Sequence, residues 1–373
     1  MFWNGQTVMQ AHEEIDEHTN EEIFPLDVSK ISQTPTKLPD GMEWCVIDPE
    51  DEDAVSAVHR FLAENYVEDN EGNFRFRYSY GFIRWVFGQP GAEKEWLVGI
   101  KSGGAIVGFI SGFPVRVSVR EKEVCMAEVD FLCLDRSMRK KGIAPLLIRE
   151  MGRRVNAKGC GQAVYTVGGR ITRPFTAARY YHRQISIRKL LSVGFSVLPR
   201  GSTVEEYEKM NRICVDGAGV FRRTTKADVK TIKSLLDETK DRWEVRRVFS
   251  EEEIEYVFCS DGGVVSLVSE DKDTFISFYT VSTVAIKENT EILCGYIYYY
   301  AAKRKADLLG AVRSVLSLCQ EMGVDVLNCL DGMENGVFIG ELGFVPGDGM
   351  LHYYLFNWKL GYTPSEKVFL SLL

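Results

Sequence analysis

The chain has 373 residues, of which 45% are hydrophobic and 26% are charged, and its formal net charge is −8. This length suits two ordinary domains or one large repeated domain, and no run of about 18 apolar residues predicts a membrane span. Nine scattered cysteines without a C-x-x-C pair predict free thiols, and five histidines without an H-E-x-x-H motif predict no metal site. The start lacks the features of a secretory signal, so we expect a cytoplasmic protein.

The charges are unevenly distributed along the chain. Between Arg136 and Lys189 there are fourteen Lys or Arg and one acidic residue, Glu150, whereas acidic residues cluster at 13–22, 48–53 and 64–71. A nucleic-acid-binding protein usually has a basic overall balance, so the acidic total argues against nucleic acid as a partner. We expect an anion site in the basic stretch and a cation site elsewhere. For any one charge run, a solvated surface is the alternative.

The predicted elements begin with a polar stretch at 11–40, which we expect to be a long loop or arm. A short strand, an acidic turn and an amphipathic helix follow at 44–65, and the same plan with the same apolar spacing recurs 174 residues later at 220–239. This recurrence predicts two halves, 1–204 and 205–373, each a mixed sheet with helices. Chance similarity between two amphipathic helices is the alternative.

Further strands and one further helix are predicted from the periodicity of hydrophobic residues and from turn residues. They are a hairpin at 96–117 that turns at 102–104, a strand at 128–133, aromatic strands at 274–286 and 293–302, and a helix at 306–323 that ends at Gly323.

A basic loop, RKKGIAP (139–145), follows the strand EVDFLC (128–133) and opens a helix. Pro145 suits the first helical turn because its missing N–H would be unpaired there. Free backbone N–H groups and the positive end of the helix dipole converge at such a loop, and Gly142 lets the backbone approach a ligand. The loop therefore predicts a diphosphate site. A solvated basic turn before an ordinary helix is the alternative.

The spacing Arg-x-x-Gly-x-Ala after a strand resembles the loop with which GNAT-type acyltransferases hold coenzyme A. It is not a Walker loop, because no Gly-Lys-Ser/Thr ends it.

Nine strings in order along the whole chain resemble the N-myristoyltransferase family. They are FW near the start, ENYVED with FRFRYS, EVDFLC with RKKGIAP, QAVYTVGG, RYYHR with KLLSVGFS, FISFYT, LDGMEN, GDGMLHYYLFNW and KVFLSLL. The resemblance implies an α/β fold with two tandem GNAT-like halves around a continuous saddle-shaped mixed β-sheet. It further implies that the N-terminal half binds myristoyl-CoA and that the C-terminal half supplies the peptide groove.

Forming an amide from a thioester requires a neutral amine and stabilisation of the carbonyl oxygen. A free α-amine has a pKa of about 7.7–8.0, so a modest base suffices. The resemblance implies that the backbone amides of Phe131 and Leu132 form an oxyanion hole and that the C-terminal carboxylate of Leu373 is the base. Thr166 and Asp130 would hold the amine. Without the resemblance, Phe131 and Leu132 could be plain core, and the apolar terminus could simply complete a sheet.

The chain departs from the family pattern at several places, including the opening FWNGQTV, which keeps only part of the family's Phe-Trp-x-Thr-Gln-Pro-Val. Asp130 stands where the family normally has Asn, and an ionised carboxylate there would favour the substrate's ammonium form and oppose its deprotonation. Asp130 is thus either a second acceptor for the amine or a residue that slows the reaction. In GFVPGDG (343–349), where the family pattern is Lys-Phe-Gly-Ile-Gly-Asp-Gly, only Phe344 and the final GDG remain.

The resemblance also implies contacts to both substrates. Myristoyl-CoA would be contacted by Phe2, Trp3, Asn4, Tyr66, Val67, Leu132, Cys133, Leu134, Arg136, Arg139, Lys140, Lys141, Gly142, Ile143, Ala144 and Pro145. A narrow groove for the peptide would be walled by Phe74, Phe76, Tyr78, Tyr180, His182 and Tyr353, and Glu68, Asp69 and Asp331 would attract a downstream Lys. A lone histidine such as His182 is otherwise a hydrogen-bonded structural residue.

The predicted reaction transfers a myristoyl group from myristoyl-CoA, the co-substrate, to the N-terminal glycine of peptides and nascent proteins. We expect a monomer without a permanently bound cofactor. The alternatives are a GNAT-type N-acetyltransferase and a catalytically idle acyl-CoA-dependent binder of Gly-ended peptides, which Asp130 keeps open.

Overall fold

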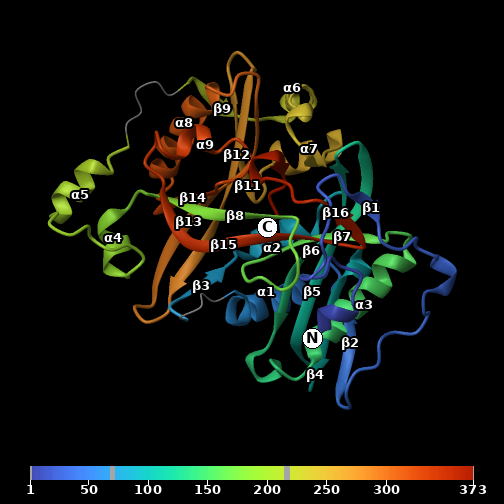
Figure 1. The fold of residues 1–373 in the computed structure, drawn as a ribbon. Coiled ribbons are helices and arrows are strands. Elements are labelled where there is room, and N and C mark those ends of the chain that lie inside the picture. The colour runs from blue at the N-terminus through green and yellow to red at the C-terminus, as the bar shows by residue number, and fades with distance from the viewer. Residues whose placement is uncertain (1, 68–71, 214–218, 373) are drawn as a thin grey trace.

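The computed structural model describes residues 2–67, 72–213 and 219–372 (Figure 1). In these ranges one sheet of 15 strands contains parallel and antiparallel pairs, and β1 forms a separate two-stranded sheet with β16. The predicted mixed α/β fold around one continuous sheet is confirmed. None of the helices in these ranges combines the length and the apolar character needed to cross a membrane.

The elements have the following bounds. The α-helices are α1 (Glu52–Asn65), α2 (Tyr80–Phe87), α3 (Ile143–Ala157), α4 (Ile187–Ser192), α5 (Val204–Met210), α6 (Val229–Glu238), α7 (Glu251–Phe258), α8 (Asp307–Glu321) and α9 (Gly336–Ile339). The strands are β1 (Asn20–Glu22), β2 (Met42–Val46), β3 (Phe74–Arg77), β4 (Leu97–Ser102), β5 (Ala105–Val119), β6 (Lys122–Leu134), β7 (Gln162–Val167), β8 (Thr176–Gln184), β9 (Phe221–Arg223), β10 (Val245–Val248), β11 (Val264–Ser269), β12 (Thr274–Ala285), β13 (Thr290–Ala302), β14 (Val326–Leu330), β15 (Val345–Phe356), β16 (Trp358–Leu360) and β17 (Val368–Phe369). Two short 3₁₀ helices used below are η1 (Phe2–Gly5) and η4 (Arg136–Met138).

The two halves repeat one plan, as the sequence predicted. In the first half, β2 pairs with β4, β4 with β5 and β5 with β6, and β6 runs parallel to β7 after a crossover through α3. In the second half, β9 pairs with β11, β11 with β12 and β12 with β13, and β13 runs parallel to β14 after a crossover through α8. The helices predicted within 44–65 and 220–239 are α1 and α6. They occupy equivalent places in the order of elements. The boundary between residues 204 and 205 stays a prediction.

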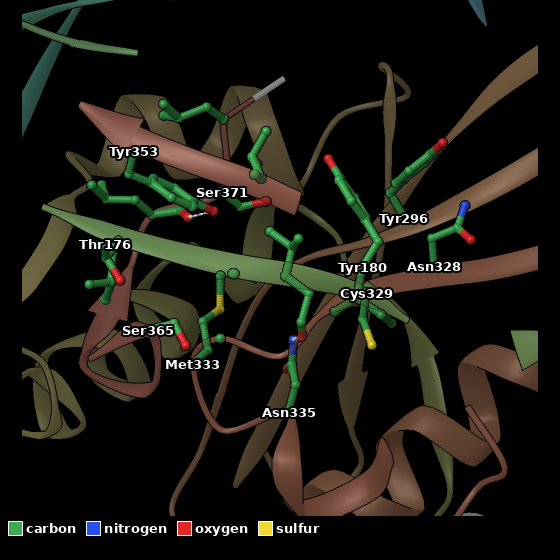
Figure 2. Close-up of a pocket in the computed structure, with 18 of the residues that line it drawn as sticks. Thr176, Tyr180, Tyr296, Asn328, Cys329, Met333, Asn335, Tyr353, Ser365 and Ser371 are labelled. Atoms are coloured by element: carbon green, nitrogen blue, oxygen red, sulfur yellow. Dashed lines mark hydrogen bonds between the residues drawn. The ribbon is translucent and has the colours of Figure 1, made fainter. Parts of the chain in front are cut away.

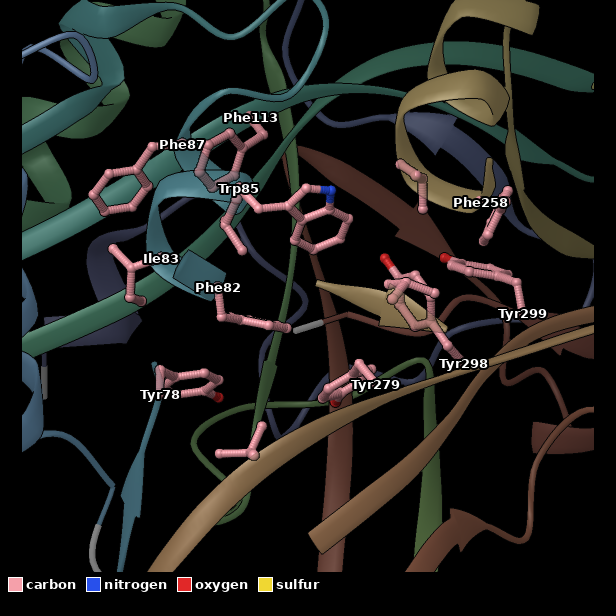
Figure 3. Close-up of a cluster of buried hydrophobic side chains, with 14 of the residues drawn as sticks. Tyr78, Phe82, Ile83, Trp85, Phe87, Phe113, Phe258, Tyr279, Tyr298 and Tyr299 are labelled. Carbon is pink, nitrogen blue, oxygen red and sulfur yellow. The ribbon is translucent and has the colours of Figure 1, made fainter. Parts of the chain in front are cut away.

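Exchanged strands join the halves into one sheet. Strand β3 of the first half pairs with β12 of the second, and β10 of the second half pairs with β5 of the first. The largest buried cluster draws on both halves: Figure 3 shows Phe82 and Trp85 from α2 near Tyr279, Tyr298 and Phe258 of the second half. This shared core makes the halves a single packing unit.

The polar stretch at 11–40 is mostly irregular, and several contacts tie it to the rest of the protein. Strand β1 pairs with β16, and the backbone N–H of Thr36 donates to Glu150 Oε2 at 2.9 Å. Glu150 on α3 is fully buried and forms ion pairs with Arg153 at 2.7 Å and Arg154 at 2.8 Å. Although burial raises its pKa, the hydrogen bonds from Arg153, Thr36 and Arg154 lower it to about 2. Glu150 is thus a structural anchor within the basic stretch.

A glycine at the junction of the halves generates the first prediction. A Cβ atom on Gly263 would lie 2.6 Å from Trp85 and 2.8 Å from Phe82, both rigid and buried (Figure 3). We expect Gly263→Ala to lower the free energy of unfolding by about 1–3 kcal/mol through overpacking, as measured by urea denaturation.

The matched control is Gly81→Ala, in the same helix as Trp85. Gly81 is exposed, and a Cβ atom added there would meet no packing neighbour within 4 Å. This change should leave stability unchanged or raise it by up to about 1 kcal/mol, because Ala favours a helix over Gly. Equal urea midpoints for Gly263→Ala and Gly81→Ala would contradict the overpacking argument.

Candidate functional site

A cavity of about 610 Å³ lies between β6, β7 and α3. This volume falls in the range of roughly 300–1,000 Å³ that is typical of small-molecule sites. Much of its wall is apolar, with contributions from Ile110, Ala127, Val129, Leu132, Ile148, Met151 and Val155. Asp130 and Thr166 add polar groups to the same wall. The cavity therefore suits a ligand with a long apolar part and a polar reacting end.

A break in the pairing of β5 with β6 shapes one wall of this cavity. Asp130 pairs with Ser111 and Cys133 with Phe109, so Phe131 and Leu132 lie opposite Ile110 alone. Such a bulge leaves backbone groups outside the ladder. It also turns Leu132, which is 39% exposed, toward the cavity that it lines.

The bulge contains a backbone conformation that is unfavourable for an aromatic residue. Phe131 has a φ of 54°, in the left-handed region, which costs on the order of 1–3 kcal/mol. Its fully buried ring packs against Tyr66 and Tyr78, each with a centroid distance of 5.3 Å, and against Phe87 at 6.4 Å. The backbone N–H of Phe131 also donates to the Tyr66 hydroxyl. This aromatic packing holds the strained residue in place.

Two carboxyl groups lie next to the bulge, on one face of β6. Asp130 is 7% exposed, and Glu128, two residues earlier, forms an ion pair with Arg247 of β10 at 3.1 Å. The Asp130 and Glu128 side chains hydrogen-bond each other. Burial raises the pKa of Asp130 well above its ordinary value of 3.8, and the charge of Glu128 raises that pKa further, against the opposing effect of Arg247. The sequence analysis did not identify Glu128 or Arg247. The two acidic residues in the otherwise apolar strand EVDFLC were a signal that could have indicated Glu128.

An aromatic stack closes another side of the cavity. Trp3 of η1 stacks on Tyr165 at 6.0 Å, and Tyr165 stacks on Tyr354 at 5.4 Å, directly opposite it in the β7–β15 pair. Phe2 lies under the Arg149 guanidinium at 5.6 Å, outside the cavity lining, and Asn4 is exposed. Sequence reasoning also missed Tyr165 and Tyr354.

The basic loop opens α3, as predicted. Gly142 is the N-cap of that helix, with a φ of 78°, and Lys140 also has a positive φ of 63°. Lys140 and Lys141 are exposed, whereas Arg139 donates to the backbone carbonyl of Asn65 at 2.7 Å. Of the predicted myristoyl-CoA contacts, the cavity is lined by Trp3, Tyr66, Val67 and Leu132. The lining of the cavity does not include the basic loop or Arg136 on η4. It also does not include Cys133 and Leu134, which belong to the core clusters.

A second, narrower cavity of about 40 Å³ lies beside the last strands (Figure 2). Its lining includes Tyr180, Tyr296 and Tyr353, and burial raises the pKa of Tyr180 to about 12. The Tyr353 hydroxyl donates to the Leu370 carbonyl at 3.2 Å, and the Ser371 N–H donates to the Tyr299 hydroxyl at 3.0 Å. Tyrosines thus hold residues 370–371 against this groove.

The other described residues predicted to contact the peptide lie outside the lining of this groove. Phe76 contacts Tyr296 and Tyr78, with centroid distances of 6.2 and 6.3 Å, whereas Phe74 packs against Phe195 at 5.8 Å. Asp331 accepts a hydrogen bond from the Arg179 backbone N–H at 2.7 Å. Glu68, Asp69 and Leu373 lie outside the described residues.

One strand pair contributes a residue to each of the two cavities. Thr166 of β7 lines the larger cavity, Tyr353 of β15 lines the smaller one, and the two residues are direct partners in the β7–β15 pair. A reacting group held at Thr166 would therefore be adjacent to both. Within the described ranges, no group of three or more His, Cys, Asp or Glu is arranged to hold a metal ion.

Comparison with known proteins identifies the family. Residues 23–178 match the family model described as Myristoyl-CoA:protein N-myristoyltransferase, N-terminal domain. Residues 192–368 match the model of the C-terminal domain of the same family. The chain belongs to the N-myristoyltransferase family. The resemblance read from the nine sequence strings is thereby confirmed.

Named relatives and a solved structure agree with this assignment. A glycylpeptide N-tetradecanoyltransferase of Plasmodium falciparum is 34% identical over 382 residues, covering 100% of this chain and 93% of that protein. Glycylpeptide N-tetradecanoyltransferase 1 of Arabidopsis thaliana is 36% identical, covering 96% and 86%. The crystal structure of Saccharomyces cerevisiae N-myristoyltransferase with bound myristoyl-CoA superposes with a TM-score of 0.90 at 31% identity, covering 98% of this chain and 94% of the yeast chain.

His182 generates a prediction for this N-myristoyltransferase family member. Its Nδ1 lies 2.7 Å from Asn328 Oδ1, and burial lowers its pKa below the ordinary value of 6.5, although Asn328 and Asp348 oppose the shift. The unfolded chain therefore takes up the proton first as the pH falls, so stability should decline below about pH 6.5. We expect the His182 ring to titrate below pH 6.5 by NMR.

The control is His182→Gln, which removes the ring and assigns its resonance. The wild type should lose more stability than this variant between about pH 7 and about pH 5.5 in urea denaturation. Parallel pH profiles for the two proteins would contradict the lowered pKa.

Proposed function

We propose that this chain transfers a myristoyl group from myristoyl-CoA, its co-substrate, to the α-amine of an N-terminal glycine in peptides and nascent proteins. The observation that carries the proposal is that an apolar cavity and a narrow aromatic groove are lined by directly paired residues, Thr166 and Tyr353. The names of the relatives and the myristoyl-CoA in the yeast structure support it. We propose a monomer that needs no permanently bound cofactor.

In this proposal the acyl chain fills the apolar cavity and the diphosphate binds at the basic loop. Backbone N–H groups at the start of α3 and the exposed side chains of Lys140 and Lys141 would supply positive potential, and Gly142 would allow close approach. Phe2, Trp3 and Asn4 would cover the CoA end. The remaining contacts would come from Tyr66, Val67, Leu132, Cys133, Leu134, Arg136, Arg139, Ile143, Ala144 and Pro145.

The amine attacks the thioester carbonyl directly, and the carbonyl oxygen becomes negatively charged. When this intermediate collapses, the amide is formed, the C–S bond breaks, and CoA leaves as the second product with a proton on its thiol. We assign its stabilisation to the backbone amides of Phe131 and Leu132, because the bulge removes this stretch from regular pairing with β5. One such donor typically contributes about 2.7–4 kcal/mol to lowering the barrier. Thr166 and Asp130, which also line the cavity, would orient the amine.

The base that takes the amine proton is, in this proposal, the C-terminal carboxylate of Leu373. Support comes from the preceding residues: Leu370 and Leu372 are buried and line the groove, and Tyr353 and Tyr299 bind the backbone of Leu370 and Ser371. A carboxylate in these apolar surroundings would have a raised pKa, closer to that of the amine.

The peptide would lie along the groove walled by aromatic side chains. Phe74, Phe76, Tyr78, Tyr180, His182 and Tyr353 would limit the first position to glycine, and Glu68, Asp69 and Asp331 would attract a downstream Lys. The raised pKa of Tyr180 keeps its hydroxyl neutral during turnover.

The decisive test is product identity. A Gly-started octapeptide with a downstream Lys, incubated with the protein and equal amounts of myristoyl-CoA and acetyl-CoA, should gain one myristoyl group by mass spectrometry, because the cavity accommodates a long chain. An Ala-started peptide is the control and should stay unmodified. Acetylation would indicate a GNAT-type acetyltransferase instead, and acyl-CoA binding without any product would indicate an idle binder.

Changing the chain terminus tests the base. Removing Leu373, or adding one residue after it, is expected to lower kcat by at least about 100-fold, within the range for loss of a general base, while the Kd for myristoyl-CoA stays unchanged. Leu373→Ile keeps the chain length and the carboxylate, so this control should retain turnover. Full activity in the extended chain would eliminate Leu373 as the base.

A further inference from the structure

A cluster of buried charges beside the reaction site has more acids than bases. Arg247 is buried, and it donates to Glu128 Oε2 at 3.1 Å and to Glu253 Oε1 of α7 at 3.2 Å. Asp130 adds a third carboxyl group in hydrogen-bond contact with Glu128. If every group were ionised, three negative charges would share the one positive charge of Arg247, which is unfavourable away from water.

The contact between Asp130 and Glu128 itself requires a proton. Two ionised carboxylates offer only acceptors and repel each other, so one proton must lie between them. Asp130 Oδ2 is shielded from solvent, and no N–H or O–H group in the described ranges donates to it. Glu128 already receives the Arg247 guanidinium, which favours its ionised form. Asp130 is therefore the better place for the proton.

We propose that Asp130 is held as a neutral carboxylic acid, which donates its proton to Glu128 and offers its remaining oxygen to the amine of the N-terminal glycine. This inference rests on the proposed function and deepens it. A neutral acceptor orients the amine without stabilising its ammonium form, so the conflict expected for an ionised Asp130 disappears. The protonated Asp130 side chain thus donates one hydrogen bond and accepts another, as the amide side chain of Asn would at this position.

The groups that face the pair are consistent with this assignment. Tyr66 and Tyr78 approach from the first half and Tyr279 from β12, and burial raises the pKa of each of them, so they stay neutral. Tyr298 and Tyr299 of β13 face Arg247 and Glu128 and are also neutral. Among the residues that the structure describes, the charged groups around the Asp130–Glu128 pair are thus Arg247 and Glu253. Burial and the charge of Glu128 favour the protonated form of Asp130.

Infrared spectroscopy tests the protonation state without turnover. Protein labelled with ¹³C-aspartate should show the C=O band of a protonated carboxyl group at neutral pH, and Asp130→Asn should lack it. Absence of that band from the wild type would overturn the proposal. This readout needs neither substrate nor product. The protonation state of Asp130 can therefore be established even if the protein fails to transfer a myristoyl group, so the two proposals can fail separately.

Kinetics tests the role of the neutral acid. Asp130→Asn should lose less kcat/KM for the peptide than Asp130→Leu does, because an amide can donate to Glu128 and accept from the amine. Asp130→Leu is similar in size but lacks both functions, and we expect it to lose at least about tenfold while the Kd for myristoyl-CoA is unchanged. On raising the pH, only the wild type should lose activity by ionisation of this residue. Equal losses in both variants would show that the ionised carboxylate is required and would overturn the inference.

Discussion

The break in pairing between β5 and β6 at Phe131 is the constraint on which the site depends. It sets Leu132 toward the cavity, separates the Phe131 and Leu132 amides from the regular ladder, and leaves Glu128 and Asp130 on one face of the preceding strand. The unfavourable φ of Phe131 persists because Tyr66, Tyr78 and Phe87 surround its ring. The aromatic core at the junction of the halves therefore stabilises the geometry of the reaction site.

The exchange of strands between the halves gives this site its charge balance. Glu128 belongs to the first half, whereas Arg247 is carried into contact with it by β10, a strand of the second half that pairs with β5. Strand β15 likewise brings Tyr353 opposite Thr166. Neither half alone would combine the carboxyl pair with its cation or the apolar cavity with the groove. The repeat thus supplies two similar scaffolds, and the proposed reaction site lies where they are joined.

Local features were predictable from the sequence, but their long-range partners were not. The hairpin that turns at 102–104, the repeated strand and helix, and the glycine-capped opening of α3 depend on neighbouring residues and were predicted correctly. The pairing of Glu128 with Arg247 joins residues 119 positions apart, and the Trp3–Tyr165–Tyr354 stack joins three distant segments. Periodicity carries no information on such contacts. The roles of Glu68, Asp69 and Leu373 remain predictions, as do those of the other site residues.

In the basic stretch at 136–189, not every Lys or Arg is available to bind an anion, because some of them are engaged with other groups of the protein. Arg153 and Arg154 neutralise Glu150, and the buried Arg183 donates to the backbone carbonyls of Gln184 and Asn211. Those cations stabilise the fold and have little positive potential left for a ligand. The exposed Lys140 and Lys141, beside the first backbone N–H groups of α3, remain available to an anion. The anion site that we propose is consequently narrower than the excess of Lys and Arg suggests, and in this proposal the helix terminus, more than the number of charges, determines where a diphosphate would bind.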